Sequence, residues 1–414
     1  MIIKRTTLYQ LVIYLILFLN LGFLNFRSNV DTYSEIFSAI LSVFLFMIYM
    51  SQKQKKIIYS WINYYIFFVF ILLAIEFFRI YFYPTGIISL TQAVQMYSSF
   101  AVLLLVYPLN EILNANSDMS QKFLKGVCIL GYIALIYRAF LWGMYNFLNI
   151  NIAPGMFITD WTRSLSGVNF VRLSGTFLDG YTIVYSWIHF FYKKQYKYIL
   201  GLIFILFFII FVIQSRAAIL EYVLITIFFL FINSVQNKNR IISVATLVLF
   251  LVVIILSNFS LINSFFDTFS VNNSQYGAST YNRLNGLNYY HDLWLNSNFW
   301  FGIGFLPDQL RMSQLLTFYL ADYNILINLY EFGVLGFIIL IFPILKGVYV
   351  FLKNINNVKK NYIIFLQVGL IMYVMVISFV QNVYWVQTIL IVPILISLIL
   401  FVEEHYNLRK NSML

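Results

Sequence analysis

Two short segments of this sequence carry arginine and aspartate side chains in a pattern that favours recognition of an anionic group. The segment VRLSGTFLDG places Arg172 seven positions before Asp179, and the segment QSRAAILEY carries Arg216. A guanidinium group is planar, permanently charged and able to donate two parallel hydrogen bonds, which suits phosphate and carboxylate ligands. Arg216 also precedes an apolar run expected to form a helix, whose free N–H groups would face the same anion. Arg216 and this helix start predict a diphosphate cradle. The alternatives are an Arg172–Asp179 pair that closes a loop and an ordinary helix cap at Arg216.

Two long stretches, residues 145–179 and 261–322, interleave aromatic residues with asparagine, aspartate and arginine. A carbohydrate-binding surface needs such a mixture, because sugar faces stack on rings and hydroxyl groups need planar polar partners. The same composition also fits an interfacial loop that lies on lipid headgroups. The candidates for substrate contact are Arg163, Tyr290 and Tyr323, in or beside these stretches, and Arg138, in the segment that precedes the first of them.

The elements that must position these residues are membrane helices. Hydrophobic residues make up 62% of the chain, against about 45–50% in soluble domains, so the composition predicts an all-α integral membrane protein. A bilayer core about 30 Å thick needs about 20 apolar residues per spanning helix. We expect one polytopic domain over residues 1–414, with spanning helices near 8–26, 34–50, 57–78, 88–109, 123–144, 180–192, 198–214, 217–233, 241–260, 323–345, 361–380 and 386–402.

When about twelve helices are placed with both chain termini in the cytoplasm, the lysines are separated from most of the arginines by the membrane. The lysines then all lie on the cytoplasmic side, in the groups Lys4, Lys53–Lys56, Lys122–Lys125, Lys193–Lys197, Lys238, Lys346–Lys360 and Lys410. This distribution agrees with the positive-inside rule. The net charge of +11 is therefore expected to orient the chain and contact anionic lipid, and the two long loops are expected to be extracytoplasmic.

The basic residues expected on the other side are arginines only: Arg27, Arg79, Arg138, Arg163, Arg172, Arg216, Arg283 and Arg311. This selection points to bidentate recognition; alternatively, lysine is excluded by topology and a few arginines anchor at the interface. Arg138 should lie on the order of 20 Å along its helix from Lys125, inside the membrane. There it either faces a polar cavity or snorkels to the interface. Glu76 and Arg79 are spaced to pair on one helix.

Four segments in the order RLSGTF, QSRAAIL, NFWFGIGF and DYNILINLYEFGVLG resemble a known family. On a twelve-helix scaffold with long outer loops they look like the O-antigen and capsular polysaccharide polymerases (Wzy-like) and the related O-antigen ligases. The resemblance covers residues 160–345. It implies a GT-C-like membrane glycosyltransferase architecture in the bacterial cytoplasmic membrane, with an extracytoplasmic active site. The implied reaction is an inverting, metal-independent glycosyl transfer between polyprenyl-diphosphate-linked oligosaccharides, without a cofactor.

The resemblance also implies roles for single residues. The family holds the diphosphate with arginines, and the matching positions here are Arg172, Arg216 and Arg283. Many members begin the last motif with histidine, at the position where this chain has Asp322. A carboxylate there can still accept a proton from a sugar hydroxyl. Asp322 is therefore the first candidate for the general base, Asp179 the second, and His291 in YYHDLW the third.

The expected partners are the lipid-linked donor and acceptor, membrane lipid, a chain-length regulator and a flippase, but no nucleic acid. No metal site is expected because the three histidines are scattered along the chain. Two alternatives remain open, a ligase that transfers the glycan to another acceptor and a flippase for lipid-linked oligosaccharides. The sequence shows no pair of related halves and gathers charge outside the membrane, which argues against the flippase.

Overall fold

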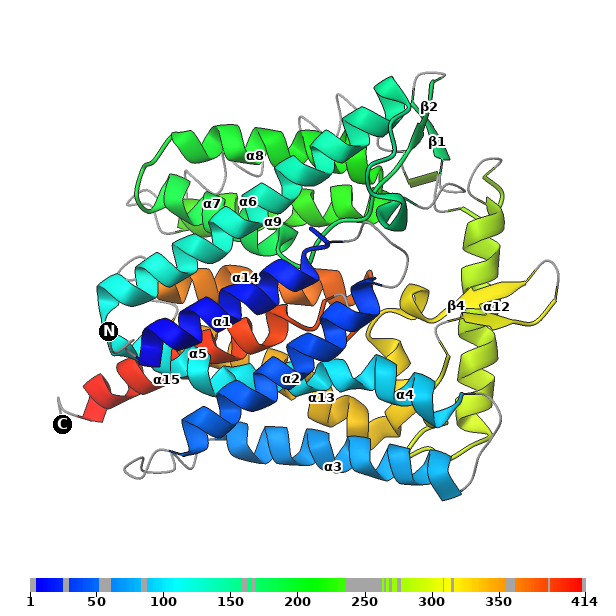
Figure 1. Ribbon diagram of the computed structural model, residues 1–414, viewed down its shortest axis with the longest axis horizontal. Coiled ribbons are helices and arrows are strands. Elements are labelled where there is room, and N and C mark those ends of the chain that lie inside the picture. The colour runs from blue at the N-terminus through cyan, green and yellow to red at the C-terminus, as the bar shows by residue number, and fades with distance from the viewer. Residues whose placement is uncertain are drawn as a thin grey trace.

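The computed structural model describes residues 5–24, 30–51, 61–82, 88–157, 162–165, 168–235, 263, 266–267, 270–273, 277–307, 309–313, 316–354, 362–385 and 388–411. These residues form an all-α bundle whose long helices run across Figure 1 from one side to the other. Two short β-hairpins and a separate helix, α12, lie at one side of this view. The bundle therefore has two distinct ends.

The N-terminal part of the bundle contains α1 (Arg5–Asn20), α2 (Val30–Met50), α3 (Trp61–Phe82), α4 (Leu90–Tyr97), the 3₁₀ stretch η1 (Ser98–Leu105), α5 (Val106–Ala115) and α6 (Ser117–Leu148). After η2 (Pro154–Met156) follow β1 (Thr162–Leu165), β2 (Val168–Val171), α7 (Asp179–Phe191), α8 (Lys197–Phe207), the π-helical stretch η3 (Phe208–Ile213) and α9 (Arg216–Val235). The remaining elements are α12 (Gly277–Leu295), β3 (Gln309–Arg311), β4 (Thr317–Tyr319), η4 (Leu320–Tyr323), α13 (Leu326–Asn354), α14 (Tyr362–Ser378) and α15 (Ile391–Asn411).

Six stretches of the described residues are long and apolar enough to cross a membrane: Thr32–Met50, Trp61–Phe82, Leu90–Ala115, Ser117–Leu148, Arg216–Ser234 and Leu326–Asn354. Each predicted spanning segment overlaps a helix, except 241–260, which lies outside the described residues. The structure thus supports an all-α, multi-pass membrane protein. The total of twelve spans stays a prediction.

The two ends of the bundle differ in charge. One end, here called the lysine end, carries both chain termini (Figure 1). Lysines lie near helix ends, Lys122 in α6, Lys197 at the start of α8 and Lys353 near the end of α13. Two acids pair with bases: Lys346 lies 2.7 Å from Glu403, and Arg5 contacts Glu111. The opposite end, here called the loop end, carries α12 and the hairpins β1–β2 and β3–β4. It contains the residues predicted to do chemistry.

Helix α13 is interrupted at Gly333, where φ is 64° and ψ is −169°. The break leaves backbone N–H and C=O groups of α13 without partners in the helix, and the segment 298–306 forms hydrogen bonds with them. Ile303 N–H donates to the Tyr330 carbonyl over 2.8 Å, and Leu335 N–H donates to the Trp300 carbonyl over 3.2 Å. Because an apolar environment offers no water to such groups, this segment completes the hydrogen bonding of the broken helix.

Two glycines allow the two backbones to touch. A Cβ atom on Gly302 would lie 2.4 Å from the Glu331 carbonyl oxygen, and one on Gly333 would lie 2.3 Å from the Trp300 carbonyl oxygen. Gly336 faces Leu72 of α3, whereas Gly333 breaks its helix with a left-handed φ that disfavours any other residue.

Arg79 binds the segment 298–306 to α3. The predicted pair is present, with Arg79 Nη1 3.0 Å from the buried Glu76 carboxylate. The guanidinium also donates to the carbonyls of Phe301, Gly302 and Ile303, at 3.2 to 3.3 Å. The segments NFWFGIGF and YEFGVLG are therefore parts of one structural unit.

Replacing either glycine of this contact is expected to destabilise the protein. Gly302→Ala and Gly333→Ala each combine a strained φ with backbone overlap, so each should lower the free energy of unfolding by at least about 1–3 kcal/mol. Gly143→Ala is the matched control, because nothing lies within 4 Å of its added Cβ within α6. Thermal unfolding of the detergent-solubilised variants measures the effect. Equal midpoints for all three variants would contradict the proposed backbone contact.

Candidate functional site

A backbone hydrogen bond joins the two segments that carry two of the predicted arginines. The N–H of Leu173 donates to the carbonyl of Val212 over 3.0 Å. Arg172 directly precedes Leu173, and Arg216 begins α9 four residues after Val212. Gln214, with a left-handed φ of 52°, ends η3 before α9 starts. The two segments that carry these partly exposed arginines thus adjoin, although they lie far apart in the sequence.

The segment that follows Arg172 is irregular but largely buried. Residues 172–178 form neither helix nor strand before α7 begins. Exposed fractions of 2% or less belong to Leu173, Phe177 and Leu178. An irregular segment can lie at membrane depth only where protein satisfies its backbone groups.

Arg138 of α6 supplies the donors that this segment needs. The residue is 6% exposed, and its Nη1 donates to the carbonyls of Ser174 over 2.5 Å and Gly175 over 3.0 Å. Its Nη2 donates to the carbonyl of Leu21 over 3.2 Å. We predicted Arg138 as a substrate contact inside the membrane. These bonds show it placed against backbone, where it positions the segment that carries Arg172.

Asp179 closes the same segment at the start of α7. Its Oδ2 accepts the N–H of Thr176 over 2.8 Å, and its Oδ1 accepts the Thr176 hydroxyl. A Cβ atom on Gly175 would lie 2.6 Å from Asp179 Oδ2, so the carboxylate also lies against this glycine. The contacts shown for Asp179 order the turn, and its carboxylate interacts electrostatically with Arg138.

A second group of predicted residues meets on α12 and η4. Arg283 Nη2 lies 2.9 Å from Asp322 Oδ1, and their side chains are 51% and 30% exposed. Asp322 belongs to the 3₁₀ turn before α13, since that helix begins at Leu326. The 19-residue helix α12 fills part of the second predicted outer loop and was not predicted, because its residues are mostly polar.

The two tyrosines predicted to touch substrate lie beneath this ion pair. Tyr290 is 0% and Tyr323 2% exposed, with ring centroids 5.1 Å apart. Burial raises the pKa of Tyr290, so its hydroxyl keeps its proton at neutral pH. Among the described residues no group hydrogen-bonds this hydroxyl. His291 is exposed and lies about 12 Å along α12 from Arg283.

The end of α14 joins the two groups. Tyr373 packs directly against Gly180, the neighbour of Asp179, because a Cβ on this glycine would lie 1.9 Å from the tyrosine ring. Five residues later, the Ser378 carbonyl accepts the N–H of Ile325, close to Asp322, over 3.1 Å. These two contacts are about 8 Å apart along the helix. The start of α7 and the chain between η4 and α13 therefore both contact the C-terminal part of α14.

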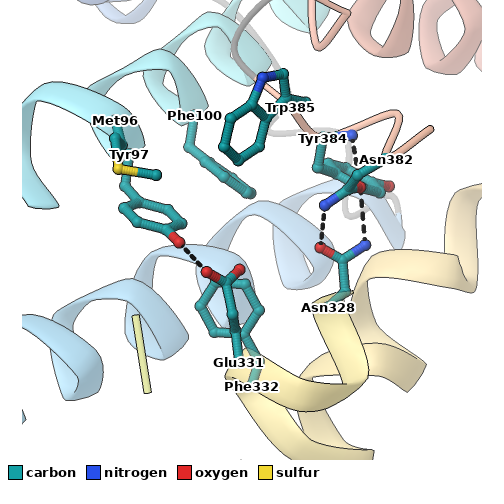
Figure 2. A pocket seen from close by; sticks show the side chains of 9 residues that line it. All are labelled: Met96, Tyr97, Phe100, Asn328, Glu331, Phe332, Asn382, Tyr384 and Trp385. Carbon is teal, nitrogen blue, oxygen red and sulfur yellow. Dashed lines mark hydrogen bonds between the residues drawn. The ribbon is translucent and has the colours of Figure 1, made fainter. Parts of the chain in front are cut away.

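A buried polar pocket near the loop end was missed by the sequence analysis (Figure 2). Tyr97 donates its hydroxyl to Glu331, whose Oε1 also accepts the Leu306 N–H over 3.1 Å. Asn328 and Asn382 exchange two hydrogen bonds of 2.8 and 3.0 Å. The free space between these side chains is about 10 Å³, close to the minimum for one water molecule.

The signal for such residues was present in the sequence. Glu331 and Glu221 are acids within long apolar runs, and ionisable residues inside spanning helices are rare and usually paired or functional. Glu331 is 2% exposed, and Glu221 on α9 interacts electrostatically with Asp179. Glu221 therefore lies near the turn that Asp179 closes.

Two further expectations concern Arg163 and metal binding. Arg163 lies on β1, where its Cα is opposite that of Phe170, but its side chain is outside the described part of the chain. Within the described residues, no three His, Cys, Asp or Glu side chains gather as a metal-binding group.

Removing the Arg138 guanidinium is expected to destabilise the irregular segment 172–178. Arg138→Met leaves the carbonyls of Leu21, Ser174 and Gly175 without these donors, at a cost of about 1–3 kcal/mol or more in the free energy of unfolding. Arg311→Met, at an exposed position, should change it by less than about 0.5 kcal/mol. Thermal midpoints in detergent compare the two. Equal midpoints would show that Arg138 does not hold the segment.

No family model matches this sequence, and no significant match to it is found among curated proteins or solved structures. An assignment of function must therefore be supported by the geometry of the loop end and by the order of its sequence motifs.

Proposed function

We propose that this protein is a membrane glycosyltransferase that joins polyprenyl-diphosphate-linked oligosaccharide repeat units into a polysaccharide. The proposal places about twelve spans in the bacterial cytoplasmic membrane, with the lysine end inside and the loop end outside. It rests chiefly on the Leu173–Val212 hydrogen bond, which joins the two segments that carry Arg172 and Arg216. Guanidinium groups on adjoining segments suit a diphosphate, because each can donate two parallel hydrogen bonds.

In the proposed reaction, a hydroxyl oxygen of the acceptor sugar attacks the anomeric carbon of the donor. The bond between that carbon and the diphosphate oxygen breaks, and the lipid diphosphate leaves with the bonding electrons. Negative charge grows on the leaving group, and arginines already fixed in place stabilise it without rearrangement. Attack from the side opposite the leaving group inverts the anomeric configuration.

Asp322 is the proposed base that receives the proton of the acceptor hydroxyl. Its ion pair with Arg283 is half-exposed, so the pair contributes at most about 1 kcal/mol to stability. A diphosphate that binds Arg283 competes with Asp322 and frees the carboxylate to accept a proton. Asp179 has its contacts with Thr176, and His291 lies farther along α12, which favours Asp322 among the three candidates.

Deletion of the protein in its own host tests the proposal. We expect single lipid-linked repeat units without a ladder of longer glycans on a gel. Full-length polymer that stays unattached would identify a ligase instead, and loss of all outer-face glycan would identify a flippase. Either result would overturn the polymerase assignment.

Adding back variants to the deleted strain tests the residues. Arg172→Lys, Arg216→Lys and Asp322→Asn should each shorten or abolish the ladder at normal protein abundance, because lysine cannot bind bidentately and asparagine cannot accept the proton. Arg311→Lys, exposed at the loop end, should restore the full ladder. Wild-type ladders from all three site variants would contradict the proposed roles of the arginines in diphosphate binding and of Asp322 as the base.

A further inference from the structure

A groove runs along the apolar surface of the bundle between α2 and α3. Its floor is formed by the end of α4 and by η1, and small side chains make it deep: Ala39, Ala74, Ser98 and Ala101. Larger residues, including Phe44 and Phe70, form its walls. Almost all of its lining is apolar, so a polar ligand would gain little there.

The groove opens on a surface that faces hydrocarbon. Both walls belong to helices long and apolar enough to span a membrane. The neighbouring side chains are exposed and apolar, with Ile40 58% and Met47 56% exposed on α2, and Phe67 58% exposed on α3. An occupant therefore enters from the membrane and is itself lipid-like.

The volume of the groove is about 620 Å³. A cavity of about 150 Å³ accommodates one benzene molecule, so the groove holds roughly four groups of that size. An isoprene unit has five carbon atoms, close to the six of benzene. A chain of several isoprene units is thus the size of occupant that the groove accommodates.

One end of the groove reaches the segment 298–306 at the loop end. Tyr97 and Phe77 line the groove, and both rings contact Phe305, with centroid distances of 3.8 and 5.1 Å. Arg79, two residues after Phe77 on α3, donates hydrogen bonds to carbonyls of the same segment. A chain lying in the groove therefore leads towards the end of the bundle that carries the arginines.

We propose that the groove between α2 and α3 binds the isoprenoid chain of a polyprenyl-diphosphate-linked substrate. This assignment rests on the proposed function for the identity of the lipid. Its physical basis is the apolar lining, the opening towards hydrocarbon, the volume and the continuity with the loop end.

Binding of undecaprenyl diphosphate to the purified protein, measured by native mass spectrometry, tests the groove without requiring catalysis. Ala74→Trp fills it from an exposed position on α3 and should weaken binding at least about tenfold. Ile136→Trp, at a 56% exposed position on α6, is the control and should bind as the unaltered protein does. Phosphatidylglycerol at the same concentration should not compete.

A photoreactive isoprenoid diphosphate provides a second test in the unaltered protein, in case the tryptophan variant fails to fold. Crosslinks should map to α2, α3 and η1. Crosslinks elsewhere, unchanged binding in folded Ala74→Trp, or equal competition by phosphatidylglycerol would each overturn the proposal. Binding as expected in a protein whose deletion leaves the glycan ladder intact would keep the groove and reject the polymerase function.

Discussion

Irregular backbone inside an apolar bundle must have its N–H and C=O groups bound by protein, and the architecture of the loop end depends on this constraint. It is met in two places by different means. At residues 172–178, the guanidinium of Arg138 binds backbone carbonyls. At the break in α13, the segment 298–306 binds the freed groups, and Arg79 ties that segment to α3. Both irregular segments are held by an arginine on a neighbouring helix.

This constraint separates two kinds of arginine. Arg79 and Arg138 donate to carbonyls and fix the shape of the loop end. Arg172 and Arg216 lie at the edges of that fixed structure and are partly exposed, and Arg283 forms a half-exposed pair with Asp322. A site that must stabilise a departing diphosphate needs donors that are already oriented, and rigid support by buried charges provides such orientation. The buried Glu331 contributes in the same way by binding Tyr97 and Leu306.

Composition and hydrophobic run length predicted the positions of the apolar helices, because each span needs a long apolar segment. The pairing of Glu76 with Arg79 also followed from local spacing. The break at Gly333 could not be predicted locally, since it exists only because residues 298–306 come from a distant part of the chain to fill it. The polar helix α12 and the burial of Tyr290 were missed for a similar reason. The local sequence there has no clear hydrophobic period, and the structure is determined by tertiary packing. The candidate residues were found by chemistry, whereas their division into two groups beside α14 required the fold.

The central claim is that the loop end transfers a glycan from one lipid diphosphate to another lipid-linked sugar. Its most direct test is reconstitution of the purified protein in liposomes with polyprenyl-diphosphate-linked repeat units as the sole substrate and a chelator present. The account predicts longer lipid-linked glycans together with an equal amount of released polyprenyl diphosphate for each new linkage. Unchanged substrate in the presence of folded protein, or transfer only after an added metal ion or a different acceptor is supplied, would contradict it.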